Sequence, residues 1–182
     1  PPTPAKLWGA RDLAWQALRL GLRWRRRAPA VEVIDTEPDL TRLPLLQLWP
    51  EDGGAFVTLP LVETRDPTDH KPNLGMYRMH RFDARRTGMH WQIGKGGGFH
   101  HAEAERLGRV LPVTVTLGGP PALILGAIAP LPEGIPEFML ASLLLGERLP
   151  RTRTPASLAA GIAARELYAE AEFSLVGEVR PG

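Results

Sequence analysis

The chain has no cysteine, and it also lacks other marks of a specialised class of protein. Without thiols it can form no disulfide, thiolate nucleophile or zinc–thiolate site, which fits a reducing compartment. No apolar run reaches the roughly 20 residues that a membrane-spanning helix needs. No secretory signal pattern is present either. We therefore expect a cytoplasmic protein with no transmembrane segment.

The chain also has little excess of charge of either sign. The 22 lysines and arginines are nearly balanced by 20 carboxylates, and a formal net charge of +2 argues against nucleic acid as the partner. Arginines do gather at the end of residues 7–27, where apolar and polar residues recur at helical spacing. This segment predicts an amphipathic helix. A basic module that binds a membrane or nucleic acid is one alternative function.

Glycine and proline are plentiful, at 19 each in 182 residues, which favours a loop-rich fold of short strands. We expect an α+β fold, with a linker helix in residues 1–30 followed by a domain over 31–182. Alternating apolar residues predict strands, and periodic apolar residues with proline and glycine at the ends predict helices. The predicted strands are 31–33, 56–67, 73–83, 87–93, 111–119 and 172–179; the predicted helices are 100–108, 121–132, 136–147 and, from its alanines, 156–172.

The densest run of glycines lies in "MHWQIGKGGGFHH", residues 89–101. It does not match a P-loop, because the lysine precedes the glycines, and its glycines are too dense for a dinucleotide-binding loop. It could bring backbone N–H groups close to an anion, or it could be only a turn between a strand and a helix. His100 and His101 are adjacent and point in different directions, so we expect surface histidines at a helix start.

Three motifs occur together in a particular order. They are "NLGMYRM" (73–79), "TGMHWQIGKGGG" (87–98) and "LPVTVTLGGPPALILGAIAPLPEGIPEF" (111–138). In this order they resemble the UbiD-type family of prenylated-FMN-dependent decarboxylases, over about residues 30–150. The resemblance implies a split β-barrel related to flavin reductases, with peripheral helices. It also implies a carboxy-lyase that reversibly and non-oxidatively removes CO2 from an aromatic or α,β-unsaturated carboxylic acid.

The resemblance also implies a set of site residues. Asn73 and Glu137 match metal ligands for Mn²⁺, with K⁺ as an optional second ion, and their oxygens suit a hard cation. Arg78 matches the catalytic arginine beside the substrate carboxylate, which a guanidinium binds through paired donors. The positions that match cofactor-binding residues are Met76, Tyr77, Arg78, His90, Trp91, Gln92, Lys95 and Gly96.

The chain departs from the family's pattern in three places. Some branches carry a metal-binding histidine at the position of Gly96, so a metal role for His100 or His101 stays open. Residues 150–171 match the family poorly. The family's proton-donor motif and its C-terminal domain are expected beyond Gly182, so we expect these 182 residues alone not to turn over.

The resemblance implies partners as well. A full-length homo-oligomer, a carboxylic acid substrate and a flavin prenyltransferase as the source of cofactor would accompany the activity. A non-catalytic module that binds flavin or nucleotide is the other alternative function.

Overall fold

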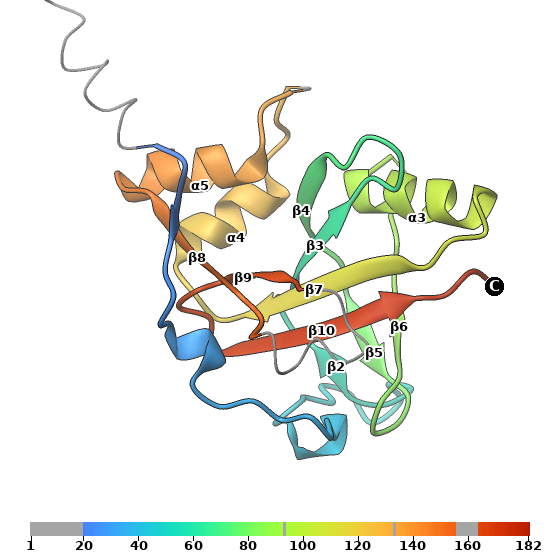
Figure 1. Cartoon of the computed structure of the whole chain (residues 1–182). Coiled ribbons are helices and arrows are strands. Elements are labelled where there is room, and N and C mark those ends of the chain that lie inside the picture. The colour runs from blue at the N-terminus through green and yellow to red at the C-terminus, as the bar shows by residue number, and fades with distance from the viewer. Residues whose placement is uncertain (1–19, 93, 133, 156–163) are drawn as a thin grey trace, which may run out of the picture.

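The computed structural model describes residues 20–92, 94–132, 134–155 and 164–182. These residues form a mixed α+β fold of three small sheets with α-helices beside them (Figure 1). The strands are β1 (Leu22–Trp24), β2 (Phe56–Val57), β3 (Leu61–Arg65), β4 (Pro72–Met76), β5 (Met79–Arg81), β6 (Thr87–Met89), β7 (Leu111–Leu117), β8 (Leu149–Arg153), β9 (Glu166–Tyr168) and β10 (Phe173–Val179). The helices are α3 (Gly96–Arg106), α4 (Pro121–Ile128), α5 (Glu137–Leu145) and two 3₁₀ turns, η1 (Pro29–Val31) and η2 (Leu40–Arg42).

The largest sheet has the strand order β10-β7-β3-β4, with every neighbouring pair antiparallel. Its register places Asn73 opposite Thr64 and Leu74 opposite Glu63. A turn joins β3 to β4, and the Asp66 carboxylate accepts the backbone N–H groups of Thr68 and Asp69 there at 2.7 and 3.0 Å. Strand β4 is left at the edge of this sheet, so its outward N–H groups need other partners.

Helices cover both sides of β3 and β4: α4 and α5 lie to one side and α3 lies to the other (Figure 1). Successive side chains along a strand point to opposite faces. Val62 and Tyr77 accordingly join one apolar cluster, with Ala104 of α3, and Leu61 and Leu74 join a second, with Phe138 of α5. The two clusters therefore form two cores that share one sheet.

Most elements predicted from the sequence are confirmed at shifted boundaries. Helix α5 begins after Pro136 and ends at Gly146, whose φ of 69° is the left-handed cap conformation that glycine favours. A turn between a strand and a helix was one of the two alternatives for the glycines of 96–98, but they form the first turn of α3. The tight turn lies earlier, at Gly94, where φ is 82°.

Three predictions of secondary structure are wrong. Of the predicted helix 7–27, residues 7–19 lie outside the described residues, and residues 22–24 form β1, which pairs in parallel with β8. Residues 29–31 form a 3₁₀ turn where a strand was expected at 31–33. Of the alanine-rich stretch, 156–163 lies outside the described residues and 166–168 forms β9. In each case pairing or packing with distant residues outweighs local propensity.

Within the described ranges, no helix is both long enough and apolar enough to cross a bilayer. The arginines near residue 25 are partly engaged within the fold. Arg25 forms an ion pair with Glu170 at 2.8 Å, and its backbone N–H bonds to the carbonyl of Arg151. The basic segment is therefore tied to the sheet that contains β8 and β9.

Candidate metal and cofactor site

Asn73, the single asparagine of the chain, lies on edge strand β4 and is 8% exposed. Its side chain points to the α3 side of the sheet, like that of Thr64 opposite it. Helix α3 begins directly beside it. A Cβ atom built on Gly96 would collide with the amide oxygen Oδ1 of Asn73, so only glycine lets the helix start this close to the amide.

Glu137 reaches the same edge strand from the first turn of α5. Its Oε2 accepts the backbone N–H of Leu74 at 3.4 Å, which satisfies an outward donor of β4. Burial raises the pKa of the Glu137 carboxyl, and the backbone N–H groups of Glu137 and Leu74 oppose this only in part. The carboxylate forms no ion pair with any other described residue. The Glu137 carboxylate therefore contacts β4 one residue from Asn73, the other predicted metal ligand, and it does so from the α5 side of the sheet.

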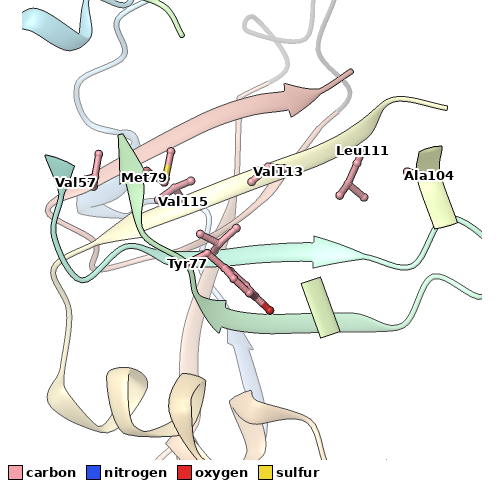
Figure 2. Packing of buried hydrophobic residues seen from close by; sticks show 8 residues of the cluster. Val57, Tyr77, Met79, Ala104, Leu111, Val113 and Val115 are labelled. Carbon is pink, nitrogen blue, oxygen red and sulfur yellow. The ribbon is translucent and has the colours of Figure 1, made fainter. Parts of the chain in front are cut away.

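Tyr77 follows β4 and is 2% exposed. Figure 2 shows it among the aliphatic side chains of the first cluster. Its hydroxyl oxygen accepts the backbone N–H of Gly97 at 2.9 Å and lies 3.5 Å from Nδ2 of Asn73. The Tyr77 hydroxyl therefore contacts both the start of α3 and the amide of Asn73.

Arg78 and His90, by contrast, are exposed residues. The N–H of His90 donates to the carbonyl of Arg78 at 2.9 Å, which continues the β5–β6 ladder by one pair. The Arg78 guanidinium lies 4.9 Å from the centroid of the Phe56 ring, a cation–π contact that orients it. No carboxylate in the described ranges pairs with this guanidinium, so its donors are available to a ligand.

The remaining predicted cofactor residues are spread along the route from β6 to α3. Trp91 is half-buried, with its ring 5.1 Å from that of Tyr77, whereas Gln92 and Lys95 are exposed. Lys95 is the N-cap residue of α3, and Met76 is partly buried against the second cluster. Backbone N–H groups and a cationic side chain thus meet at one helix start, which is an arrangement that suits a phosphate.

The two adjacent histidines have separate structural surroundings. His100 was expected on the surface but is 7% exposed, and its Nδ1 lies 2.8 Å from the Thr64 hydroxyl oxygen. Burial lowers the pKa of His100, opposed by the charges of Asp66 and Asp69. His101 stacks on Trp91 with ring centroids 5.4 Å apart. Among the described residues no three His, Cys, Asp or Glu side chains gather as a metal site.

The sequence did not indicate a buried ion pair on the other side of the sheet. Arg151 of β8 is 2% exposed, and its Nη2 lies 2.6 Å from Oε2 of Glu63. Its guanidinium also lies 4.7 Å from the centroid of Phe138, the residue after Glu137. Burial raises the pKa of Glu63, against the opposing charge of Arg151. No motif signals this pair, because its members are 88 residues apart and belong to different sheets.

Comparison with known proteins gives a family match over most of the chain. The UbiD family model, described as 3-octaprenyl-4-hydroxybenzoate carboxy-lyase Rift-related domain, matches residues 23–182. A 4-hydroxybenzoate decarboxylase polypeptide of Chlamydia pneumoniae is 47% identical over 183 residues, which cover 100% of this chain and 30% of that protein. An uncharacterised protein of Chlamydia muridarum is also 47% identical over 183 residues, with 100% and 31% covered.

Solved structures agree with the family match. The UbiD-class enzyme HmfF from Pelotomaculum thermopropionicum, as an evolved dimeric form in complex with prFMN, gives a TM-score of 0.80 at 26% identity, covering 94% of this chain and 40% of that one. A 3,4-dihydroxybenzoic acid decarboxylase from Enterobacter cloacae gives a TM-score of 0.76 at 27% identity, covering 95% and 37%. The chain thus spans about a third of the length of its relatives.

Proposed function

The chain belongs to the UbiD family, and from this premise we propose that it is the cofactor-binding part of a UbiD-class carboxy-lyase. The proposed reaction is the reversible, non-oxidative decarboxylation of an aromatic or α,β-unsaturated carboxylic acid. One observation supports the proposal most. At the free edge of β4 the Glu137 carboxylate bonds to the backbone N–H of Leu74, and the amide of the preceding residue, Asn73, lies against the start of α3.

The residues at this edge fit a hard divalent cation such as Mn²⁺. Asn73 supplies an amide oxygen and Glu137 a carboxylate, the donor types that such ions prefer. Glu137 is partly buried without an ion-pair partner in the described ranges, so a cation would offset the cost of its burial. Gly96 adds no side-chain ligand. The protein would therefore offer two ligands and leave other positions to cofactor phosphate oxygens.

Prenylated FMN, when bound, would supply the covalent chemistry that activates the substrate. Lys95 and the backbone of Gly96 would hold its phosphate end at the start of α3. Met76, Tyr77, His90, Trp91 and Gln92 would form the strand-side wall. In this scheme Arg78 binds the substrate carboxylate through paired N–H donors, and its contact with the Phe56 ring helps to orient the guanidinium.

The finer architecture is part of the same proposal. The three sheets would form a split β-barrel of the flavin-reductase kind, with α3, α4 and α5 at its periphery. Residues 31–182 would make up the cofactor-binding domain, and the segment 1–30 would lead into it through β1. A homo-oligomer would be the working form, as the dimeric form of the HmfF relative suggests.

A titration tests the proposed function. The intact protein is mixed with Mn²⁺ and reduced prenylated FMN, and binding is followed by the cofactor's absorbance. We expect binding by the wild type, loss of binding in Glu137→Gln, and retention in the matched control Glu103→Gln, whose carboxylate pairs with Arg106 within α3.

The outcomes separate the alternatives. Binding together with CO2 release from an aromatic acid supports the carboxy-lyase. We expect these 182 residues alone to bind without releasing CO2, so the release assay uses the full-length protein that contains them; binding without release there, from any acid of either class, favours a non-catalytic flavin module. Absence of binding in the wild type overturns the proposal.

A further inference from the structure

We propose that Tyr77 is a positioning residue for Asn73. Its buried hydroxyl ties the asparagine amide to the first turn of α3 and so holds the amide oxygen Oδ1 toward the cation position. This inference rests on the proposed function for the identity of the cation. The fixation of the amide itself can be measured without any metal.

The hydrogen bonds define the direction of the amide. Tyr77 Oη accepts the N–H of Gly97 at 2.9 Å, and Nδ2 of Asn73 faces the same oxygen at 3.5 Å. Because Nδ2 points to Tyr77, Oδ1 points the other way, over the backbone of Gly96. This oxygen is the atom that a hard cation would bind. A hydroxyl that fixes the nitrogen therefore fixes the ligand oxygen as well.

Close packing restricts the Tyr77 ring. A Cβ on Gly75 would come within 2.6 Å of the ring, and a Cβ on Gly97 within 2.8 Å of it. Trp91 covers the ring from another direction, at 5.1 Å between centroids, and His101 stacks on Trp91 in turn. Glycine at positions 75 and 97 is thus what lets the ring enter this space. Packing that holds the Tyr77 ring also holds its hydroxyl group in position.

The hydroxyl also serves the helix. The first N–H groups of an α-helix have no partner within the helix, and the Lys95 side chain at the N-cap makes no capping hydrogen bond. Tyr77 Oη takes the place of such a cap for Gly97. Two groups of the proposed site therefore share one oxygen atom. Tyr77 would act on a bound cation only through Asn73, in the way that outer partners orient metal ligands.

The test uses the only two tyrosines of the chain. Tyr77→Phe removes only the hydroxyl oxygen from the site. Tyr168→Phe is the matched control, since the hydroxyl of Tyr168 lies 3.5 Å from Glu170, away from Asn73. Both variants are made in the intact protein and compared with the wild type by urea unfolding, which reports any general loss of stability.

The first measurement needs no metal. The side-chain NH₂ resonances of Asn73 are observed with ¹⁵N-asparagine labelling and assigned by their loss in Asn73→Asp. We expect the Asn73 resonances to shift, and the exchange of their hydrogens with solvent to accelerate about tenfold, in Tyr77→Phe but not in Tyr168→Phe. Unchanged resonances in Tyr77→Phe overturn the inference.

The second measurement is Mn²⁺ affinity by calorimetry with cofactor present. We expect Tyr77→Phe to weaken binding roughly tenfold and Tyr168→Phe to leave it unchanged. If the wild type binds no Mn²⁺, the proposed function fails while the NMR measurement still decides the role of Tyr77. If Tyr77→Phe lowers only the unfolding midpoint, with amide and affinity unchanged, Tyr77 is merely structural and the inference is overturned.

Discussion

The two sides of β3 and β4 bury polar groups in different ways. On the α3 side the buried groups are neutral and are joined by single hydrogen bonds, Thr64 to His100 and Tyr77 to Gly97. On the α5 side the buried polar contact is an ion pair, Arg151 with Glu63, packed against Phe138. The same sheet therefore has neutral buried polar groups on its α3 face and a buried ion pair on its α5 face.

The two sides should differ in how much stability is lost when a buried group loses its partner. A buried neutral group that loses its partner costs its own desolvation, about 1–3 kcal/mol, whereas a buried charge that loses its partner costs roughly 3–5 kcal/mol. The α5 side should therefore be the more sensitive to loss of one partner. The Asn73 amide lies on the neutral side and the Glu137 carboxylate arrives from the charged side, so both kinds of packing would meet at the proposed metal position.

The largest effect is expected from Arg151→Met, which keeps the volume but leaves Glu63 buried without its nearest cation. We expect a loss of roughly 3–5 kcal/mol in the free energy of unfolding, measured by urea denaturation. Arg65, 3.9 Å from Glu63, offsets part of this. The double variant with Glu63→Gln should recover at least half of the loss. A loss below about 1 kcal/mol in the single variant would remove the contrast between the two sides.

A smaller effect is expected from Thr64→Val, which has nearly the same shape. It removes the hydroxyl beside Nδ1 of His100 and leaves that nitrogen buried without its partner. We expect a loss of about 1–3 kcal/mol by the same measurement. A loss as large as that of Arg151→Met would mean that neutral and charged cores are equally sensitive.

The pH dependence should sharpen the comparison further. Burial holds the pKa of His100 below its usual value of 6.5, so the unfolded chain binds the proton more readily than the folded one. The contribution of His100 to stability is therefore present above pH 6.5 and is lost as the pH falls toward the lowered pKa. We expect the urea midpoint to drop between pH 7.5 and pH 5, and to drop less in His100→Gln. An equal drop in both proteins would assign the pH dependence to other groups.

The smallest effect on stability is expected from Arg106→Ala, on the solvated surface of α3. Hydrogen bonds from Arg106 and Thr68 lower the pKa of Glu103 to about 2. Removing the guanidinium should raise that pKa toward 4.5, as followed by carboxyl ¹³C NMR, with the urea midpoint unchanged. A changed midpoint would show that solvated pairs also matter here.

The sequence predicted the local part of this fold better than the distant part. Strand β7 and helix α5 were correct because alternation, a leading proline and a closing glycine all lie within the elements themselves. Strands β1 and β9 were missed because each forms only by pairing with β8, which no local pattern announces. The glycines of 96–98 suggested a turn because glycine is a poor helix former, and the hydrogen bond from Gly97 to Tyr77 is not visible in the local sequence.

The candidate site shows the same limit. The motif order pointed to Asn73 and Glu137, and in the structure the Glu137 carboxylate bonds to the backbone N–H of Leu74, the residue after Asn73. The surroundings of His100 could not be predicted, since its partner Thr64 is fixed by the packing of α3 on β3. The lack of room for a side chain at Gly96 could not be predicted either, because the atom that fills this space belongs to Asn73 on another element.

Helix α3 opens with three successive glycines, which are poor helix formers by roughly 1 kcal/mol each relative to alanine. Its first turn would not persist in isolation. It is supported by the Tyr77 hydroxyl, which accepts the N–H of Gly97, and by the Asn73 amide, which lies against Gly96. This turn should therefore form after β4 has joined the sheet, and it should be among the earliest parts of α3 to open in native-state hydrogen exchange. Asn73 on β4 and the first turn of α3, which flank the proposed site, would then become ordered together during folding.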